Sequence, residues 1–249
     1  MKNIFAVFII LISSNIILGF THNFNHIYLA GTDTVEIKTI NYTKSLPDSS
    51  AFINIYYPQI NVMENTLVEN KINSFLSDEF QQSIVWYDEL IADTVEMDAN
   101  NNGVSYSFET GFEIKYNSKT FLSISLDHYQ FTGGAHGNYY SLGYNIRLND
   151  GKILTLEDII NESSFDLLSY ECEQAFIDTF QVTSILEAGL FEDEINILPD
   201  QDFYIIPGAL VLQFDPYEIA PYAMGELEVR IPFDRIKDIL KDNLPFSTK

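Results

Sequence analysis

Short stretches in which apolar and polar residues alternate recur through most of this sequence, and they limit its possible folds more than any other feature. A period of two is typical of a half-buried β-strand, because successive side chains point to opposite faces of the sheet. Turn signals separate several of the stretches: Asn149, Asp150 and Gly151 predict a tight hairpin, and so do Pro207 and Gly208. The predicted strands cover residues 34–40, 51–57, 104–108, 120–128, 139–148, 152–154, 203–206, 209–214 and 226–231.

Helical patterns lie between groups of strands. Apolar residues recur at intervals of three and four from residue 64 to about 91, which predicts an amphipathic helix. Thr155 and Asp158 have the spacing of a capping box that opens a short helix. Further helices are predicted around Cys172 and from about residue 234 to 240. Because the helices do not alternate with the strands one by one, the sequence predicts an α+β fold, a mostly antiparallel sheet packed against a few helices.

The first 20 residues are typical of a membrane-targeting segment. An apolar run from Ile4 to Phe20 follows a short head that carries Lys2, and it gives way abruptly to polar residues. This pattern predicts a signal peptide, with an uncleaved N-terminal anchor as the alternative. We therefore expect the protein to be exported, periplasmic or extracellular, and to meet the membrane only through that segment if it is retained.

The composition is that of an acidic globular protein. Hydrophobic residues make up 46% of the 249 residues, which is enough to build a core. Asp and Glu number 36 against 13 Lys and Arg, so the formal net charge is −23. Such a charge repels nucleic acid and anionic membranes and attracts cationic partners. We exclude nucleic-acid binding on this ground, and the charge serves either to steer a partner or simply to keep the protein soluble.

A single cysteine, Cys172, lies on the apolar face that its predicted helix forms with Leu168, Ala175, Phe176 and Phe180. This placement predicts a buried, inert thiol and not a nucleophile. One cysteine also cannot form an intramolecular disulfide.

A calcium-loop pattern occurs between the first long helix and the next strand. Asp98, Asn100 and Asn102 occupy ligand positions one, three and five, and the pattern continues to Gly103 and Glu109. The residues after Gly103 alternate as a strand, however, where an EF-hand needs a helix. A strand would carry Glu109 roughly 20 Å from Gly103, out of ligand range. The pattern therefore favours a polar turn, with calcium binding as the weaker alternative, and we expect no metal and no cofactor.

The most unusual stretch runs from Phe131 to Asn138 and contains three glycines within five residues. Such a loop permits positive φ angles and can present amide hydrogens to an anion, and His136 can act as acid, base or ligand. His128 continues an apolar strand face and is predicted to lie in the core, whereas Asp127 points to the opposite face. A pairing of His136 with Asp127 across the bend stays open, and so does a purely structural loop that braces two strands.

A second unusual stretch, residues 214–225, interleaves two prolines with aromatic residues between two predicted strands. Tyr217 and Tyr222 can line a binding surface here, because tyrosine offers a large apolar face with a polar tip. The alternative is a rigid corner packed on the sheet.

Three stretches together carry a family resemblance: residues 129–137, 151–158 and 215–225. The first reads Tyr-x-Phe-Thr-Gly-Gly-Ala-His-Gly, and the third ends in Tyr-Glu-Ile-Ala-Pro-Tyr-Ala-x-Gly. With these motifs the chain resembles, over about residues 34 to 241, the extracytoplasmic domain of unknown function shared by the lysozyme-sensing anti-sigma factor RsiV and the peptidoglycan deacetylase PdaC.

This resemblance implies an α+β fold with a PdaC-like half over residues 21–150 and an RsiV-like half over residues 151–249, intimately packed together. In RsiV the domain resembles a receptor for cationic lysozyme. In PdaC the chemistry belongs to a separate metal-dependent deacetylase domain, so the resemblance implies no activity for this region. Because only three residues precede the apolar run, we also expect no cytoplasmic sigma-binding region.

We therefore expect an exported, non-enzymatic binding domain for a cell-envelope component, either a polysaccharide or a cationic protein such as lysozyme. The alternative is an envelope hydrolase or a deacetylase-associated enzyme that uses His136 with a nearby carboxylate such as Asp127, although no nucleophile motif accompanies them. A structural envelope protein without a ligand is a third reading. The predicted ligand-binding residues are Tyr129, Phe131, Thr132, Gly133, Gly134, His136, Asn138, Tyr217 and Tyr222.

Overall fold

The computed structural model describes residues 34–46, 51–62, 65–97 and 106–248. The apolar run at the start of the chain and the calcium-loop candidates Asp98, Asn100 and Asn102 lie outside these residues. Glu109, the last position of that calcium pattern, lies inside a strand and not in a helix.

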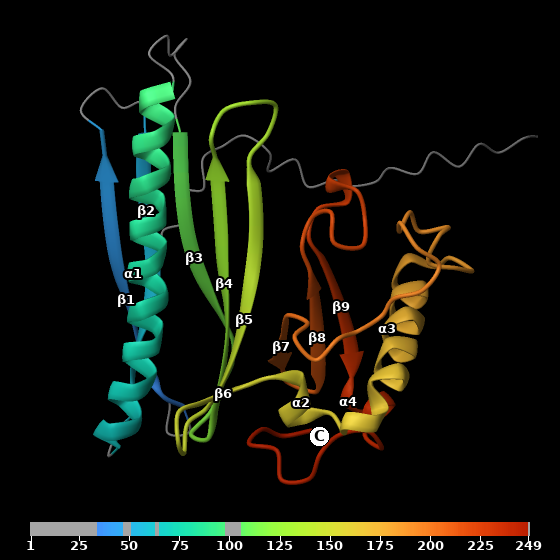
Figure 1. The fold of residues 1–249 in the computed structure, drawn as a ribbon. Coiled ribbons are helices and arrows are strands. Elements are labelled where there is room, and N and C mark those ends of the chain that lie inside the picture. Colours follow the sequence, from blue (N-terminus) through green and yellow to red (C-terminus); the bar gives the residue numbers. More distant parts are fainter. Residues whose placement is uncertain (1–33, 47–50, 63–64, 98–105, 249) are drawn as a thin grey trace, which may run out of the picture.

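Two β-sheets form the centre of the molecule (Figure 1). The larger has six strands in the order β1-β2-β3-β4-β5-β6, and the smaller has three in the order β7-β8-β9. The strands of the larger sheet are β1 Glu36–Ser45, β2 Ala51–Asn61, β3 Tyr106–Asn117, β4 Phe121–Phe131, β5 Asn138–Arg147 and β6 Lys152–Leu154. Those of the smaller sheet are β7 Phe203–Ile206, β8 Ala209–Phe214 and β9 Leu227–Pro232.

All neighbouring strands are antiparallel except β2 and β3, which are parallel. The exception follows from α1, Thr66–Met97, which carries the chain from β2 back before β3 begins. A helical crossover is the connection that parallel neighbours need. The predicted α+β fold with mostly antiparallel sheet is confirmed.

Helix α1 covers one face of the larger sheet (Figure 1). Asn65 begins it, since its side-chain Oδ1 accepts a hydrogen bond from the amide of Val68 at 3.3 Å. Its apolar stripe packs against the sheet in a buried core that includes Val68, Ile72, Leu76, Ile37, Ile60, Leu122 and Ile124. The predicted helix is confirmed, and it extends about six residues beyond its predicted end near residue 91.

The remaining helices pack with the smaller sheet. They are α2 Leu156–Ile159, α3 Phe165–Phe180 and α4 Phe233–Ile236, with short 3₁₀ turns at Glu162–Ser164 and Tyr222–Met224. Figure 1 shows α3 beyond the smaller sheet, on the side away from α1. The capping box of α2 is present, because the Thr155 amide donates to Asp158 Oδ2 at 3.2 Å.

Two predictions in this part need correction. Phe180 was expected on the buried face of α3, but 42% of it is exposed, because α3 ends there and Gln181 takes the left-handed φ of 53°. The last helix was expected over residues 234–240, but α4 ends at Ile236. The chain turns away there because Leu240 forms a β-bridge with Ile160. Cys172 is fully buried as predicted.

The two sheets are in direct contact at Gly143 on β5. A Cβ atom added there would lie 1.9 Å from the carbonyl oxygen of Phe203, the first residue of β7. Beside it, Asn145 Nδ2 donates to the same oxygen at 2.8 Å, and the Ile205 amide donates to Ser123 Oγ at 3.0 Å. A glycine is therefore required where β7 crosses β5, and polar groups fasten the layers around it.

Candidate functional site

Two segments far apart in the sequence meet at one end of the sheets: the loop Thr132–Gly137 between β4 and β5, and residues 215–225 between β8 and β9. The Tyr222 hydroxyl donates a hydrogen bond to the carbonyl oxygen of Gly137 at 2.6 Å. The ring of His136 stacks on the ring of Tyr222, with 3.9 Å between their centroids and 22° between their planes. The two unusual stretches of the sequence thus form one surface.

Four rings make up this surface, which we call the aromatic platform: His136, Tyr139, Tyr217 and Tyr222. Tyr139 meets Tyr222 edge-on at 5.8 Å between centroids, and Tyr217 lies beside Tyr222 at 5.6 Å. The side of the platform at Tyr217 faces solvent, since 59% of that residue is exposed. His136 is exposed as well, so two of the four rings are open to a ligand.

The backbone around the platform is tightly constrained. A Cβ atom added to Gly137 would lie 2.5 Å from the ring of Tyr129, so the ring of Tyr129 rests directly on this glycine. Tyr217 has a φ of 74°, which is unfavourable for a residue with a side chain. Its amide donates to the carbonyl of Ala220 at 3.1 Å, which helps to hold that conformation. Residues held in such conformations cluster at functional sites.

The predicted ligand-binding residues have different positions relative to the platform. His136, Tyr217 and Tyr222 are part of it, and the ring of Tyr129 packs against Gly137 next to it. Thr132, Gly134 and Asn138 are exposed in or next to the same loop, whereas Phe131 and Gly133 are half-buried. Tyr139 also belongs to the platform, but it was not predicted from the sequence. Its position just after the glycine-rich loop, next to Tyr140, is the sequence feature that could have identified it.

The two candidate catalytic residues take part in separate networks. The Nδ1 of His136 lies 2.8 Å from the carbonyl oxygen of Gly137. Asp127 on β4 accepts hydrogen bonds from the hydroxyls of Ser125 and Ser141, both at 2.9 Å. Within the described residues, no hydrogen bond joins His136 to Asp127.

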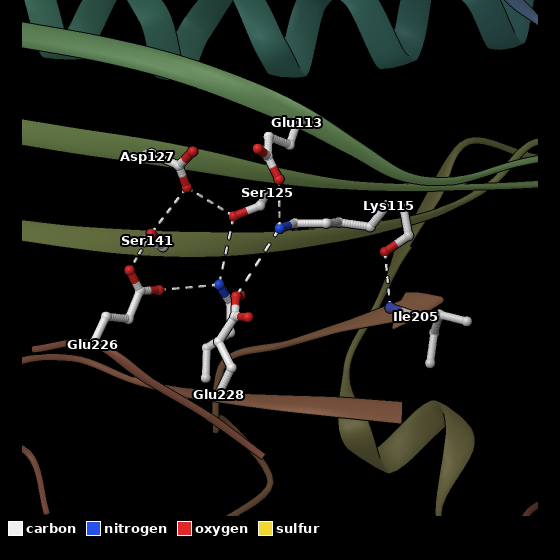
Figure 2. Close-up of polar contacts among 10 residues, drawn as sticks. Glu113, Lys115, Ser125, Asp127, Ser141, Ile205, Glu226 and Glu228 are labelled. Carbon is white, nitrogen blue, oxygen red and sulfur yellow. Dashed lines mark hydrogen bonds and ion pairs between the residues drawn. The ribbon is translucent and has the colours of Figure 1, made fainter. Parts of the chain in front are cut away.

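Asp127 belongs to a polar network between the two sheets, shown in Figure 2. The hydroxyl of Ser141 on β5 lies 2.9 Å from Asp127 Oδ1 and 3.1 Å from Glu226 Oε2, and Gln213 Nε2 on β8 donates to Glu226 Oε1 at 3.2 Å. Burial raises the pKa of Glu226 to about 7, the hydrogen bond from Ser141 opposes this shift, and the negative charges of Asp127, Glu228 and Asp215 add to it.

Asp215 shows a similar perturbation. Its Oδ1 accepts a hydrogen bond from the Ser141 amide at 3.2 Å. Burial raises the pKa of Asp215 to about 6, and the nearby charges of Glu218 and Asp202 act in the same direction. Perturbed carboxyls of this kind mark candidate functional sites.

His128 lies in the core as predicted. Its Nδ1 is within 3.4 Å of the Tyr87 hydroxyl and 3.3 Å of the Thr110 hydroxyl, and its ring stacks on Tyr140 at 4.6 Å between centroids. Burial lowers its pKa to about 4, so the imidazole is neutral at physiological pH. A cavity of about 70 Å³ lies beside it under α1, away from the aromatic platform.

Among the described residues, no group of three or more His, Cys, Asp or Glu side chains is placed to hold a metal ion. Within the same part of the chain, no helix is long and apolar enough to cross a membrane.

The two halves of the platform lie in regions that match two different protein families. Residues 47–139 match the family described as deacetylase PdaC, and residues 157–234 match a family of unknown function, DUF3298. The family resemblance is confirmed. His136 and Tyr139 lie in the PdaC match and Tyr217 and Tyr222 in the DUF3298 match, so the platform is built from both.

Two curated relatives come from Bacillus subtilis. Peptidoglycan-N-acetylmuramic acid deacetylase PdaC is 22% identical over 210 residues, which cover 82% of this chain and 40% of PdaC. Anti-sigma-V factor RsiV is 27% identical over 214 residues, which cover 82% of this chain and 71% of RsiV. This chain therefore spans about two fifths of the length of PdaC.

Two solved structures share the fold. A member of the DUF3298 family from Bacteroides fragilis has a TM-score of 0.71 at 20% identity, covering 86% of this chain and 96% of that one. A DUF3298 family protein from Pseudomonas aeruginosa has a TM-score of 0.59 at 18% identity, covering 84% and 96% of the two chains.

Proposed function

We propose that this protein is an exported, non-enzymatic binding domain whose aromatic platform recognises a component of the cell envelope. The observation that carries the proposal is the exposed ring of Tyr217, held beside Tyr222 and His136 by a backbone conformation that is unfavourable for tyrosine. A buried structural corner would not need such a ring to face solvent.

A glycan is the ligand that the platform itself favours. Tyrosine rings present flat apolar faces with polar edges at little cost in conformational entropy, and a pyranose ring has an apolar face of C–H bonds and a rim of hydroxyls. Exposed loop residues such as Thr132 and Asn138 provide hydrogen-bonding groups next to the rings. The relative PdaC is named for action on peptidoglycan, which supports a wall glycan as the ligand class.

A cationic protein is the second candidate, and the charge of the chain favours it. The formal net charge of −23 produces a field that speeds the encounter with a basic partner. Glu218 is exposed next to Tyr217, so a lysine or arginine that stacks on the platform would also meet a carboxylate.

Binding of the purified protein to soluble peptidoglycan glycan strands and to lysozyme separates these candidates. Tyr217→Ala should weaken binding to the glycan about fivefold to tenfold, as expected for loss of one aromatic contact. Tyr170→Ala is the matched control, because Tyr170 is 54% exposed but lies on α3. Binding to lysozyme should weaken as salt is raised. Failure of both probes to bind at low ionic strength would refute the proposal.

A further inference from the structure

One carboxylate lies on the sheet face that leads to the aromatic platform. Glu109 on β3 is the cross-strand neighbour of Tyr129 on β4, which in turn is the neighbour of Tyr139 on β5. Directly paired residues point to the same face of a sheet. This face is opposite to α1, because the adjacent Phe108 packs in the cluster that α1 covers. With strands about 4.8 Å apart, Glu109 lies one strand from Tyr129 and about 10 Å from the platform residue Tyr139.

Tyr129 connects Glu109 with the rest of the platform. Its ring rests on Gly137, whose carbonyl oxygen accepts the hydrogen bond from the Tyr222 hydroxyl at 2.6 Å. Burial raises the pKa of Tyr129, and Glu109 and Tyr222 both act in the same direction, so each lies within electrostatic reach of its hydroxyl. A ligand that covers this side of the platform therefore meets the Glu109 carboxylate.

Glu109 has no partner among the residues that the structure describes. It is half-buried, and within that part of the chain it forms neither a hydrogen bond nor an ion pair. A carboxylate that loses part of its water without gaining a partner is unfavourable, and burial accordingly raises the pKa of Glu109. A cationic group of a ligand would compensate for the lost water, whereas a neutral group would not.

Lys and Arg are absent from the segments that build the platform. Neither residues 120–146 nor residues 153–229 contain one. Lys115, further along β3, is already paired with Glu113 at 2.8 Å (Figure 2). Glu218, exposed next to Tyr217, adds a further negative charge. The platform therefore attracts cationic groups and repels anionic ones.

We propose that the ligand of the platform is a glycan with free amino groups, and that Glu109 pairs with the ammonium of a sugar stacked on its rings. The inference rests on the proposed function and narrows the class of its glycan. The rings contact the C–H face of a sugar whether or not its nitrogen is acetylated. Only the free amine carries a charge, so it alone gains the pairing with Glu109 and the attraction to the faces of the rings.

Two oligosaccharides that differ only in acetylation test the proposal: β-1,4-linked glucosamine and β-1,4-linked N-acetylglucosamine of the same length. Calorimetry measures both affinities at an ionic strength of about 0.1 M and at about pH 6, below the ordinary pKa of an amine. The glucosamine oligomer should bind about tenfold more tightly, as expected for one hydrogen bond to a charged group. The preference should shrink as more salt is added.

Glu109→Gln should remove most of this preference, because it keeps the shape of the side chain and removes its charge. Its affinity for the N-acetylglucosamine oligomer should stay unchanged. Glu113→Gln is the matched control. It removes an exposed carboxylate from the same face of β3 about 13 Å away, which exceeds the screening length of about 10 Å. This variant should keep the preference of the unmodified protein.

Equal affinities for the two oligomers would overturn the inference and leave the proposed binding of a glycan intact. If neither oligomer binds, the inference and the glycan function fail together. A preference that persists in Glu109→Gln would show that Glu109 does not contact the amine. A lysine-rich peptide that binds more tightly than the glucosamine oligomer, and loses affinity in Glu109→Gln, would assign this surface to a protein partner instead.

Discussion

Substitution of Gly143 by alanine should destabilise the protein strongly, because it forces the two sheets apart. The added Cβ atom would lie 1.9 Å from the Phe203 carbonyl oxygen and 2.7 Å from its carbonyl carbon. Relief of this overlap requires a local separation of more than about 1 Å, since non-bonded carbon contacts favour roughly 3.5 Å. Such a shift breaks the hydrogen bonds from Asn145 to the Phe203 carbonyl and from the Ile205 amide to Ser123, at 2.8 and 3.0 Å.

Each buried group left without a partner costs about 1–3 kcal/mol, so the two lost bonds together amount to roughly 2–6 kcal/mol. This is a large part of the 5–15 kcal/mol that typically separates folded from unfolded states. Urea denaturation measures the loss as a lower midpoint with a similar slope. Gly134→Ala is the control: nothing lies within 4 Å of its added Cβ atom, and only the φ of 102° is unfavourable. A Gly143→Ala midpoint no lower than that of Gly134→Ala would refute the close packing of the sheets.

Three further predictions concern single side chains. Burial lowers the pKa of His128 to about 4. The contribution of neutral His128 to the free energy of unfolding is therefore fully present above pH 6.5 and is lost as pH falls towards 4. In His128→Gln the decrease in unfolding free energy between pH 6.5 and pH 4 should be smaller by about 3 kcal/mol than in the unmodified protein, as measured by urea denaturation of both proteins at both pH values. Tyr217→Asn should weaken platform binding without lowering the urea midpoint, because asparagine tolerates the positive φ of 74° better; a large drop in midpoint would contradict the inferred backbone strain. Cys172 is fully buried and its pKa is raised by burial, so a thiol reagent should label it only when the protein unfolds, and rapid labelling of the folded protein would show that α3 is misplaced.

The hairpins and helices could be predicted because their signals are local. Asn149 to Gly151 and Pro207 with Gly208 define turns regardless of the rest of the fold, and the period of α1 marks its buried stripe. The parallel pairing of β2 and β3 was not predicted, because it depends on where α1 delivers the chain. The last helix was predicted too long, because its end is decided by the pairing of Leu240 with Ile160.

The network between the sheets was missed for a similar reason. On β4, Ser123 and Ser125 alternate with Leu122 and Ile124, which predicts one apolar face and one solvent face. Both faces are in fact buried, one under α1 and the other against the smaller sheet. Serines on a strand look the same in sequence whether they face water or a second polar layer, and their partners Asn145, Ile205 and Gln213 lie on other strands.

The site depends on both parts of the chain that the two family matches cover. The platform stacks His136 of the PdaC match on Tyr222 of the DUF3298 match, and the network below it joins Asp127 to Glu226 in the same way. Ser141, which links the two carboxyls, lies between the matched regions. Neither region alone contains the platform or this network. Under the proposed function, a ligand that covers both His136 and Tyr217 contacts both regions at once, and a movement between the two sheets would change the geometry that it meets.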